Sequence, residues 1–270
     1  MTQIDLTGKR ALITGGSQGI GSEICRELAE CGANVLINYF RNKEKAEILV
    51  KEIRKTYQVN AFAYGADVSS SKQVKEMFLA MDKSLEGIDI LVNNAGRENV
   101  VHALDLKEDD WDAVIDTNLK GPWLCSREAG KRMIETGGGV IINISSIHDI
   151  VPRKGLIHYC SAKAGLKMFS KCLSLELAES NIRVVSVSPG VIETEMNREE
   201  IIRFGKEKFE KWIPQGRIGN AGDVAKSVAF LASNLASYIH GADLYIDGAY
   251  MNHTIHYDPR LPRGKKNKNK

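Results

Sequence analysis

The sequence predicts an α/β fold, with a single doubly wound parallel sheet of about seven strands and helices on both of its faces. Short apolar runs alternate along the chain with longer stretches of helical spacing. Strands separated in this way favour a parallel sheet between two helical layers. The 270 residues, of which 43% are hydrophobic and 26% are charged, suffice for one sizeable core without a second domain.

The apolar runs and the helical stretches place the elements in order. We expect strands at 10–14, 34–38, 60–64, 88–92, 139–144, 182–187 and 243–246. We expect helices at 19–31, 43–57, 70–85, 100–135 (broken), 158–179 and 221–233. Residues 191–215 interrupt the alternation with a mixed, charged helical stretch, which we interpret as a lid over the substrate. One domain then spans 1–258, and a basic, flexible tail follows at 259–270.

The composition indicates where in the cell the protein is expected to act and which classes of partner it is expected to lack. The chain has no long apolar run and no charged-then-apolar leader, so we expect neither a membrane span nor a signal peptide. A net charge of +3, concentrated in the tail, does not indicate a nucleic-acid partner. We expect no metal, because no His, Cys or carboxylate cluster has ligand spacing. An odd number of cysteines without a C-x-x-C pair indicates reduced thiols in a cytoplasmic protein: Cys25, Cys31, Cys125, Cys160 and Cys172.

The turn after the first strand predicts a phosphate cradle. It carries the pattern Thr-Gly-x-x-x-Gly-x-Gly from Thr14 to Gly21, between an apolar strand and a helix. Glycines let the backbone turn tightly and approach a ligand without a Cβ in the way. The start of the helix then offers free N–H groups and a positive dipole end to a pyrophosphate. The sheet is therefore expected to be of the Rossmann type.

Two further motifs lie in the first half of the chain. Asn93-Asn94-Ala95-Gly96 follows the strand at 88–92, and small residues there let a flat ring pack on the backbone. The carboxyl end of a parallel strand is also where open α/β sheets bind ligands. Asn118 lies inside a predicted helix, where its side chain is expected to bind backbone groups or order a water.

A tyrosine and a lysine form a candidate pair for proton transfer. Tyr159 and Lys163 share one face of a helix because they are four residues apart, and Ser146 precedes the tyrosine by thirteen residues. A free phenol has a pKa of about 10 and keeps its proton at neutral pH. An ammonium beside it lowers the pKa of the phenol, so the pair can give or take a proton at an alcohol carbon.

Together these motifs resemble the short-chain dehydrogenase/reductase family, from about Leu6 to about Gly248, including Ser188-Pro189-Gly190 after the strand at 182–187. The resemblance implies hydride transfer between a nicotinamide and a secondary alcohol or ketone. It gives proton transfer to Tyr159, substrate positioning to Ser146 and a relay water to Asn118. Lys163 would tune the phenol and hold the nicotinamide ribose. The family also implies a homotetramer through the helices near 100–135 and 158–179 and the last strand.

The resemblance also implies the residues that hold the cofactor. They come from the glycine turn, the ends of the second and third strands, the Asn-Asn-Ala-Gly turn, the catalytic helix and the Pro-Gly turn. They are Thr14, Gly15, Ser17, Gln18, Gly19, Ile20, Gly21, Asn38, Tyr39, Arg41, Asp67, Val68, Asn94, Ala95, Gly96, Tyr159, Lys163, Pro189, Gly190, Ile192 and Thr194.

The end of the second strand favours NADP(H), with NAD(H) also possible. An acidic residue at that position would bind the adenosine ribose and repel a 2′-phosphate. Here Asn38 and Tyr39 are neutral, and Arg41 follows shortly with a guanidinium that suits a phosphate.

Two polar residues bear on the substrate. Glu98 follows the Asn-Asn-Ala-Gly turn and His148 lies two residues after Ser146, a pattern that resembles the bacterial glucose 1-dehydrogenases. The expected substrate residues are therefore Glu98, Ser146, His148 and Tyr159, with a sugar such as glucose as substrate.

Other substrates and functions stay open. Arg153 and Lys154 introduce positive charge that would suit an anionic substrate. We interpret His253 and His256 as candidate substrate contacts in a neighbouring subunit's site, with a packing role as the alternative. A hydroxysteroid dehydrogenase and a 3-oxoacyl-carrier-protein reductase are alternatives within the family. A non-catalytic nucleotide-binding protein is a remote alternative, because the four residues of the expected catalytic set are all present.

Overall fold

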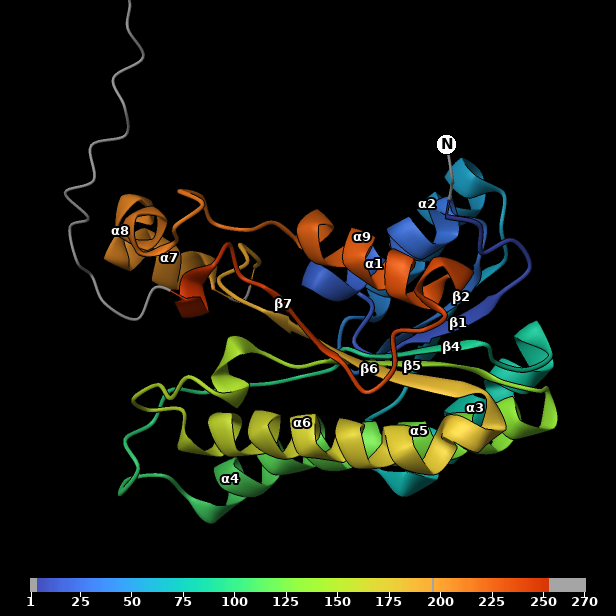
Figure 1. The fold of residues 1–270 in the computed structure, drawn as a ribbon, viewed down its shortest axis with the longest axis horizontal. Coiled ribbons are helices and arrows are strands. Elements are labelled where there is room, and N and C mark those ends of the chain that lie inside the picture. The colour runs from blue at the N-terminus through green and yellow to red at the C-terminus, as the bar shows by residue number, and fades with distance from the viewer. Residues whose placement is uncertain (1–3, 196, 253–270) are drawn as a thin grey trace, which may run out of the picture.

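Seven parallel strands form one sheet in the computed structural model, which describes residues 4–195 and 197–252 (Figure 1). The order across the sheet is β3-β2-β1-β4-β5-β6-β7, and all six pairings are parallel. The strands are β1 (Arg10–Ile13), β2 (Asn34–Tyr39), β3 (Ala61–Gly65), β4 (Ile90–Asn93), β5 (Gly139–Ile144), β6 (Ile182–Pro189) and β7 (Asp243–Ile246). The predicted fold class and the seven predicted strands are confirmed.

Helices cover both faces of this sheet. One layer holds α1, α2 and α9, and the opposite layer holds α3, α5 and α6, with α4 beside α6 (Figure 1). Helices α7 and α8 lie apart at one end. The helices are α1 (Gly19–Glu30), α2 (Lys43–Tyr57), α3 (Ser71–Leu85), α4 (Glu108–Ile115), α5 (Gly121–Glu135), α6 (Ile157–Leu177), α7 (Arg198–Phe204), α8 (Lys206–Trp212) and α9 (Ala221–Ala232).

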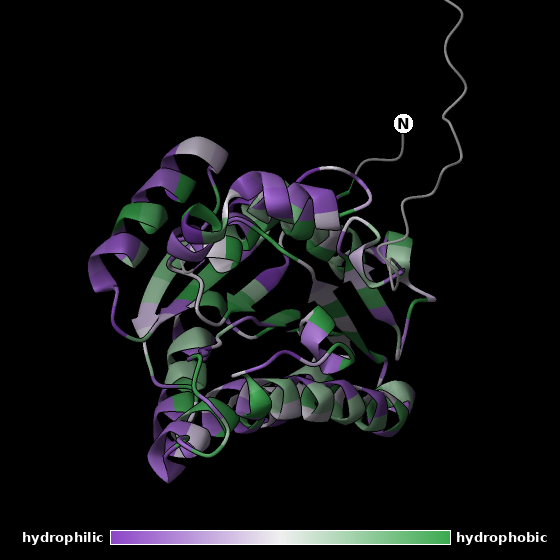
Figure 2. Ribbon diagram, turned by 90° about the vertical axis from the view of Figure 1, so that its left-hand side faces the viewer, coloured by the Kyte–Doolittle hydropathy of each residue, from purple (hydrophilic) through white to green (hydrophobic). Residues whose placement is uncertain are grey.

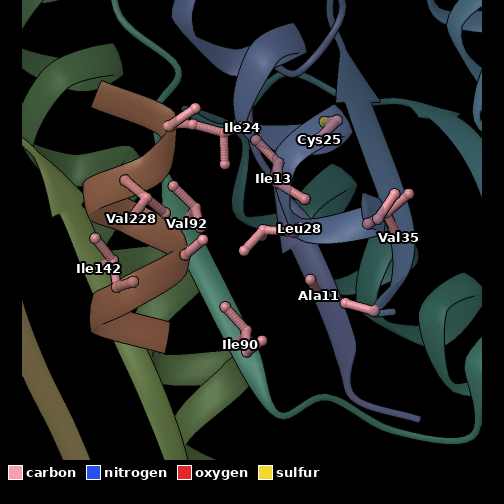
Figure 3. Close-up of a cluster of buried hydrophobic side chains, with 14 of the residues drawn as sticks. Ala11, Ile13, Ile24, Cys25, Leu28, Val35, Ile90, Val92, Ile142 and Val228 are labelled. Atoms are coloured by element: carbon pink, nitrogen blue, oxygen red, sulfur yellow. The ribbon is translucent and has the colours of Figure 1, made fainter. Parts of the chain in front are cut away.

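The strands separate two hydrophobic cores because successive side chains of a strand point to opposite faces. Ala11 and Ile13 of β1 pack in the core under α1, α2 and α9, while Leu12 packs in the core under α3 and α5. Figure 3 shows the first core, where Ile24 and Leu28 of α1 meet the sheet. Strands buried on both faces are near-continuously apolar, as the hydrophobic colours of the strands in Figure 2 show.

One predicted helix begins later than expected. Residues 100–107 have no helical structure, although the sequence pattern predicts a broken helix from 100 to 135. The first turn of α4 carries Glu108, Asp109 and Asp110, and carboxylates at this end of a helix are stabilised by its dipole. The loop before it is held by a Val101 N–H that donates to the Gly155 carbonyl. This contact holds the loop, where the sequence predicts helix, beside the segment before α6.

The predicted helical stretch at 191–215 contains α7 and α8. These two short helices rest on a small core of their own, with Ile201, Ile213 and Ile218 buried. Gly205, at a φ of +88°, joins them. No helix of the described ranges 4–195 and 197–252 is long and apolar enough to cross a membrane. The predicted tail at 259–270, the boundary at 258, and His253 and His256 lie outside the described residues.

The packing between α1 and the sheet gives a stability prediction. Leu28 is fully buried, so Leu28→Ala is expected to lower the free energy of unfolding by about 2–5 kcal/mol through lost burial and a new cavity. Ile48→Ala on α2 removes a side chain that is 57% exposed, so we expect the free energy of unfolding to change by less than about 0.5 kcal/mol. Urea unfolding of both variants checks this. Equal losses would contradict the assignment of the core.

Candidate active site

The loops after six strands meet at one edge of the sheet and enclose a cavity of about 910 Å³. The point between β1 and β4, where the order of connection reverses, is the expected binding crevice of an open α/β sheet. Most of the predicted site residues line this cavity. They are Gly15, Ser17, Gln18, Gly19, Ile20, Gly21, Asn38, Arg41, Asp67, Val68, Asn94, Ala95, Gly96, Glu98, Asn118, Ser146, His148, Tyr159, Lys163, Pro189, Gly190, Ile192 and Thr194.

The glycine turn between β1 and α1 approaches its neighbours too closely for side chains. A Cβ on Gly21 would lie 2.4 Å from the Gly15 carbonyl oxygen and 2.5 Å from Asn94 Nδ2. Gly15 itself has a φ of +61°, which favours glycine. The turn therefore leaves the start of α1 open toward the cavity, as an N-terminal anion site needs.

Thr14 contributes to this cradle from behind. Its hydroxyl accepts from the backbone N–H groups of Asn94 and Ala95, each at 3.0 Å. Asn94 Nδ2 in turn donates to the carbonyls of Thr14 and Gly15 at 3.0 and 3.1 Å. Thr14 is buried and does not line the cavity, so its side chain joins the two turns rather than facing a ligand.

Asn38 and Tyr39 lie on opposite sides of the end of β2. Asn38 Oδ1 accepts from the Gly15 N–H at 3.2 Å, and its Nδ2 donates to the Ala66 carbonyl at 3.0 Å. Tyr39 packs its ring against Gly65 and does not line the cavity. Asn38 thus braces the glycine turn against β3, while Tyr39 contributes no side chain to the cavity wall.

Arg41, Asn42 and Phe40 line the cavity beyond the end of β2. We call this part of the cavity the adenosine end, because the sequence predicts the adenosine there. The Arg41 guanidinium lies 5.3 Å from the centre of the Phe40 ring. Asn42 Nδ2 donates to Gln18 Oε1 at 2.7 Å. Lys45 forms a 2.6 Å ion pair with Glu195, which lines the far wall of the cavity.

Asn118 lies in a π-helical segment, Asp116–Lys120, between α4 and α5. Such segments are rare and often occur at functional sites. Its Nδ2 donates to the carbonyls of Arg97 and Val114 at 2.8 and 2.9 Å. Its Oδ1 is buried and has no protein partner within the described residues. A buried acceptor of this kind suits an ordered water.

Ser146 begins a 3₁₀ turn, Ile147–Asp149, after β5. Its hydroxyl oxygen accepts from the His148 N–H at 3.2 Å. His148 Nδ1 lies 2.8 Å from the Val151 carbonyl oxygen. A carbonyl only accepts, so Nδ1 carries a proton, and in the neutral imidazole Nε2 is then an acceptor. The imidazole meets the Tyr159 ring edge to face, with 6.3 Å between ring centres.

Tyr159 and Lys163 face the cavity from the first turns of α6. Tyr159 is half-buried and Lys163 is 4% exposed. Lys163 Nζ donates to the Ile144 carbonyl at 2.8 Å and lies 5.5 Å from the centre of the Tyr159 ring. The helix therefore brings the predicted pair together against the end of β5.

Burial dominates the acid–base behaviour of this pair. It lowers the pKa of Lys163 to about 8, while the carboxylates of Glu98 and Asp149 act in the opposite direction. Burial also raises the pKa of Tyr159, and Glu98 adds to the rise, with Ser146 and Arg153 opposing it. The sequence predicts a lowered pKa for the phenol, and this direction is wrong for the protein as the structure shows it, because burial raises the pKa.

The substrate end of the cavity is polar and charged. His158 Nε2 lies 2.7 Å from Asn99 Oδ1 and ties the loop that carries Glu98 to α6. Within residues 4–195 and 197–252, the Glu98 carboxylate has no hydrogen-bond or ion-pair partner. Arg153, from the loop before α6, forms an ion pair with Glu200 of α7. This pair connects the catalytic side of the cavity to α7.

Several lining residues were not among the predicted site residues. They lie on α7, α8 and the segment before them, where charged and apolar positions give no ligand-binding motif: Asn197, Glu200, Ile201 and Phe209. Phe40 and Asn42 at the adenosine end were also missed. The only signal for the first group is the interruption of the strand–helix alternation at 191–215.

The cavity fits a dinucleotide. The glycine turn leaves space that a Cβ on Gly21 would fill. The buried Asn118 Oδ1 has no hydrogen-bond donor among the described residues and can accept from a bound water. The pyrophosphate would lie at the start of α1, the adenine beside Asp67 and Val68, and the nicotinamide between Gly96 and Gly190.

Comparisons with known proteins identify the family of the chain. A family model described as short chain dehydrogenase matches residues 9–202. The 3-oxoacyl-(acyl-carrier-protein) reductase FabG of Staphylococcus aureus is 42% identical over 242 residues, which cover 89% of this chain and 97% of that protein. A Mycobacterium marinum short-chain type dehydrogenase/reductase is 37% identical, with a TM-score of 0.86, and covers 92% of this chain and 97% of that one.

A further solved structure is that of a gluconate 5-dehydrogenase from Burkholderia cenocepacia in complex with NADP and tartrate. It is 33% identical, has a TM-score of 0.87, and covers 92% of this chain and 97% of that one. The chain therefore belongs to the short-chain dehydrogenase/reductase family and is an NAD(P)-dependent oxidoreductase.

Proposed function

We propose that this oxidoreductase uses NADP(H) and acts on a small polyhydroxylated substrate, with D-glucose as the first candidate. The observation that carries the proposal is the polar substrate end of the cavity, where Glu98 and His148 flank Tyr159. The Glu98 carboxylate and His148 Nε2 are both acceptors for substrate hydroxyls. A site built to hydrogen-bond hydroxyls discriminates strongly against substrates that lack them.

In the proposed chemistry the nicotinamide supplies or accepts the hydride. The Ser146 hydroxyl donates to the substrate oxygen, and the Tyr159 phenol exchanges a proton with that oxygen. The raised pKa of Tyr159 keeps the phenol protonated at neutral pH, which suits donation to a carbonyl. Oxidation of an alcohol needs the phenolate, so we expect oxidation to gain from alkaline conditions. Lys163 favours the phenolate by its charge, and Asn118 Oδ1 holds a water behind it.

The adenosine end supports NADP(H) over NAD(H). Arg41 lines the cavity beside Phe40, and its guanidinium has no carboxylate partner among the described residues. The end of β2 carries Asn38, which braces the glycine turn instead of offering an acidic group to a ribose. A guanidinium at this position would pair with a 2′-phosphate.

A reductase acting on a 3-oxoacyl thioester is the second candidate. It is favoured by the 42% identity to the Staphylococcus aureus enzyme. Ile201 and Phe209 also give α7 and α8 an apolar surface toward the cavity that an acyl chain could contact.

We further propose a homotetramer. Three large apolar side chains on α5 and α6 point away from the two cores: Trp123 is 46% exposed, Met168 is 61% exposed and Leu175 is 80% exposed. A helical face of this kind is stabilised by burial against another subunit.

Removal of Arg41 tests the cofactor assignment. Arg41→Ala is expected to raise KM for NADP⁺ on the order of ten-fold and to leave KM for NAD⁺ nearly unchanged, because only the former carries the 2′-phosphate. Lys51→Ala, an exposed α2 position outside the cavity, is the matched loss of charge. Steady-state assays at 340 nm measure the KM of each variant for NADP⁺ and for NAD⁺. An equal effect on the two cofactors would contradict the assignment.

A substrate panel tests the proposed substrate class. D-glucose, D-gluconate, a hydroxysteroid and acetoacetyl-CoA are each assayed with the matching redox form of either cofactor. We expect turnover of a sugar or sugar acid, and Glu98→Gln to raise its KM on the order of ten-fold through a lost charged hydrogen bond. Glu108→Gln on the exposed start of α4 is the matched control.

Tyr159→Phe in the same panel removes the proposed proton donor and is expected to lower kcat by roughly 100-fold or more. Turnover confined to acetoacetyl-CoA would establish the second candidate and exclude the sugar. Full turnover by Tyr159→Phe would exclude the proposed proton transfer.

Native mass spectrometry tests the assembly. We expect a particle of four chains, and Leu175→Glu to shift it toward smaller species, because a charge in an apolar interface is costly. Ile48→Glu, on the exposed surface of α2, is the matched control and is expected to leave the assembly intact. A wild-type monomer would contradict the proposal.

A further inference from the structure

A buried carboxylate lies directly behind the turn that carries Ser146 and His148. Asp149 ends this 3₁₀ turn, and its backbone N–H donates to the Ser146 carbonyl at 3.0 Å. The exposed fraction of the Asp149 side chain is 0%. Burying a charge is costly unless it is paired and hydrogen-bonded, so the surroundings of Asp149 decide what it does.

Three hydroxyl groups and an ammonium surround this carboxylate. The hydroxyls of Ser145 and Ser188 donate to Asp149 Oδ2 at 3.2 and 2.9 Å. The Tyr245 hydroxyl donates to Oδ1 at 2.9 Å. Lys167 Nζ donates to the Tyr245 oxygen at 2.5 Å and lies 3.9 Å from Asp149 Oδ1. Asp149 thereby joins the turn to the ends of β5 and β6, to β7 and to α6.

The same carboxylate acts on Lys163. Lys163 and Lys167 are four residues apart and share one face of α6. Burial lowers the pKa of Lys163 to about 8, and Asp149 and Glu98 oppose this by favouring the ammonium. The groups that face Lys163 are thus Glu98 from the loop after β4, Asp149 from the turn after β5, and Tyr159 on its own helix.

We propose that Asp149 is a positioning residue for the oxidoreductase reaction, whose carboxylate holds the turn that carries Ser146 against β6, β7 and the face of α6 that carries Lys163 and Lys167. Asp149 does this from behind the cavity wall, which it does not line. The inference rests on the roles proposed above for Ser146 and Lys163.

A neighbouring carboxylate provides the matched comparison. Asp243 of β7 lies 3.6 Å from Lys167 Nζ and 3.3 Å from Lys171 Nζ. It belongs to the same cluster of charges as Asp149, but it makes no hydrogen bond to the turn after β5. A role in stability alone would affect both carboxylates, whereas a positioning role is specific to Asp149.

The test compares Asp149→Asn with Asp243→Asn in the full-length protein. In Asp149→Asn we expect kcat with D-glucose and NADP⁺ to fall on the order of ten-fold, with KM for NADP⁺ unchanged. Titration of ¹³C-labelled lysine by NMR, with Lys163 assigned through Lys163→Met, is expected to show a lower midpoint for Lys163. Loss of a nearby negative charge disfavours the ammonium, which fixes this direction. Asp243→Asn is expected to leave kcat and the midpoint unchanged.

Three outcomes overturn the inference. They are an unchanged midpoint in Asp149→Asn, an unchanged kcat in the same variant, and equal losses in Asp243→Asn. If circular dichroism shows that Asp149→Asn does not fold, Tyr245→Phe replaces it, because it removes one donor and keeps the charge. We expect a smaller loss of kcat in Tyr245→Phe with the Lys163 midpoint in place, and full activity overturns the inference.

The experiment distinguishes failure of the proposed function from failure of the inference about Asp149. If the wild type turns over none of the panel substrates, the proposed substrate class fails. The NMR titration needs no substrate and then decides the inference on its own.

Discussion

The close contact between the glycine turn after β1 and the Asn94 turn after β4 is the constraint on which the rest of the site depends. The two turns share hydrogen bonds through Thr14 and Asn94, with no space for a Cβ on Gly21. Asn38 fixes the same turn from β2. These contacts hold the start of α1 at the switch point of the sheet, where open α/β sheets bind their ligands, and so orient the remaining loops around one cavity.

Two lysines place positive charge on one buried face of α6. Lys163 and Lys167 both lie largely inside the protein, and each is supported by carboxylates from other elements. Buried ammonium groups are stable only when such partners offset the lost hydration. The helix therefore depends on the turn after β5 and on β7, which couples the position of the catalytic pair to the last strand of the sheet.

The sequence predicts the fold and the residue types of the site well, because both follow from local patterns. Strand–helix alternation and the glycine turn depend on residues close together in the chain. Three features depend on tertiary context instead. The loop at 100–107 is held by Gly155, Asn38 turns inward to brace Gly15, and burial reverses the expected direction of the Tyr159 pKa. None of these contacts has a signature in the sequence.

The ion pair between Lys45 and Glu195 has a consequence for the dynamics of the protein. It joins α2 to the loop after β6, where Glu195 lines the cavity, and its side chains are 47% and 56% exposed. Exposed ion pairs of this kind weaken as the ionic strength rises, because the Debye length shortens. Because the pair connects α2 to a residue of the cavity wall, we expect higher ionic strength to weaken this contact and to raise the exchange rate of a bound nucleotide.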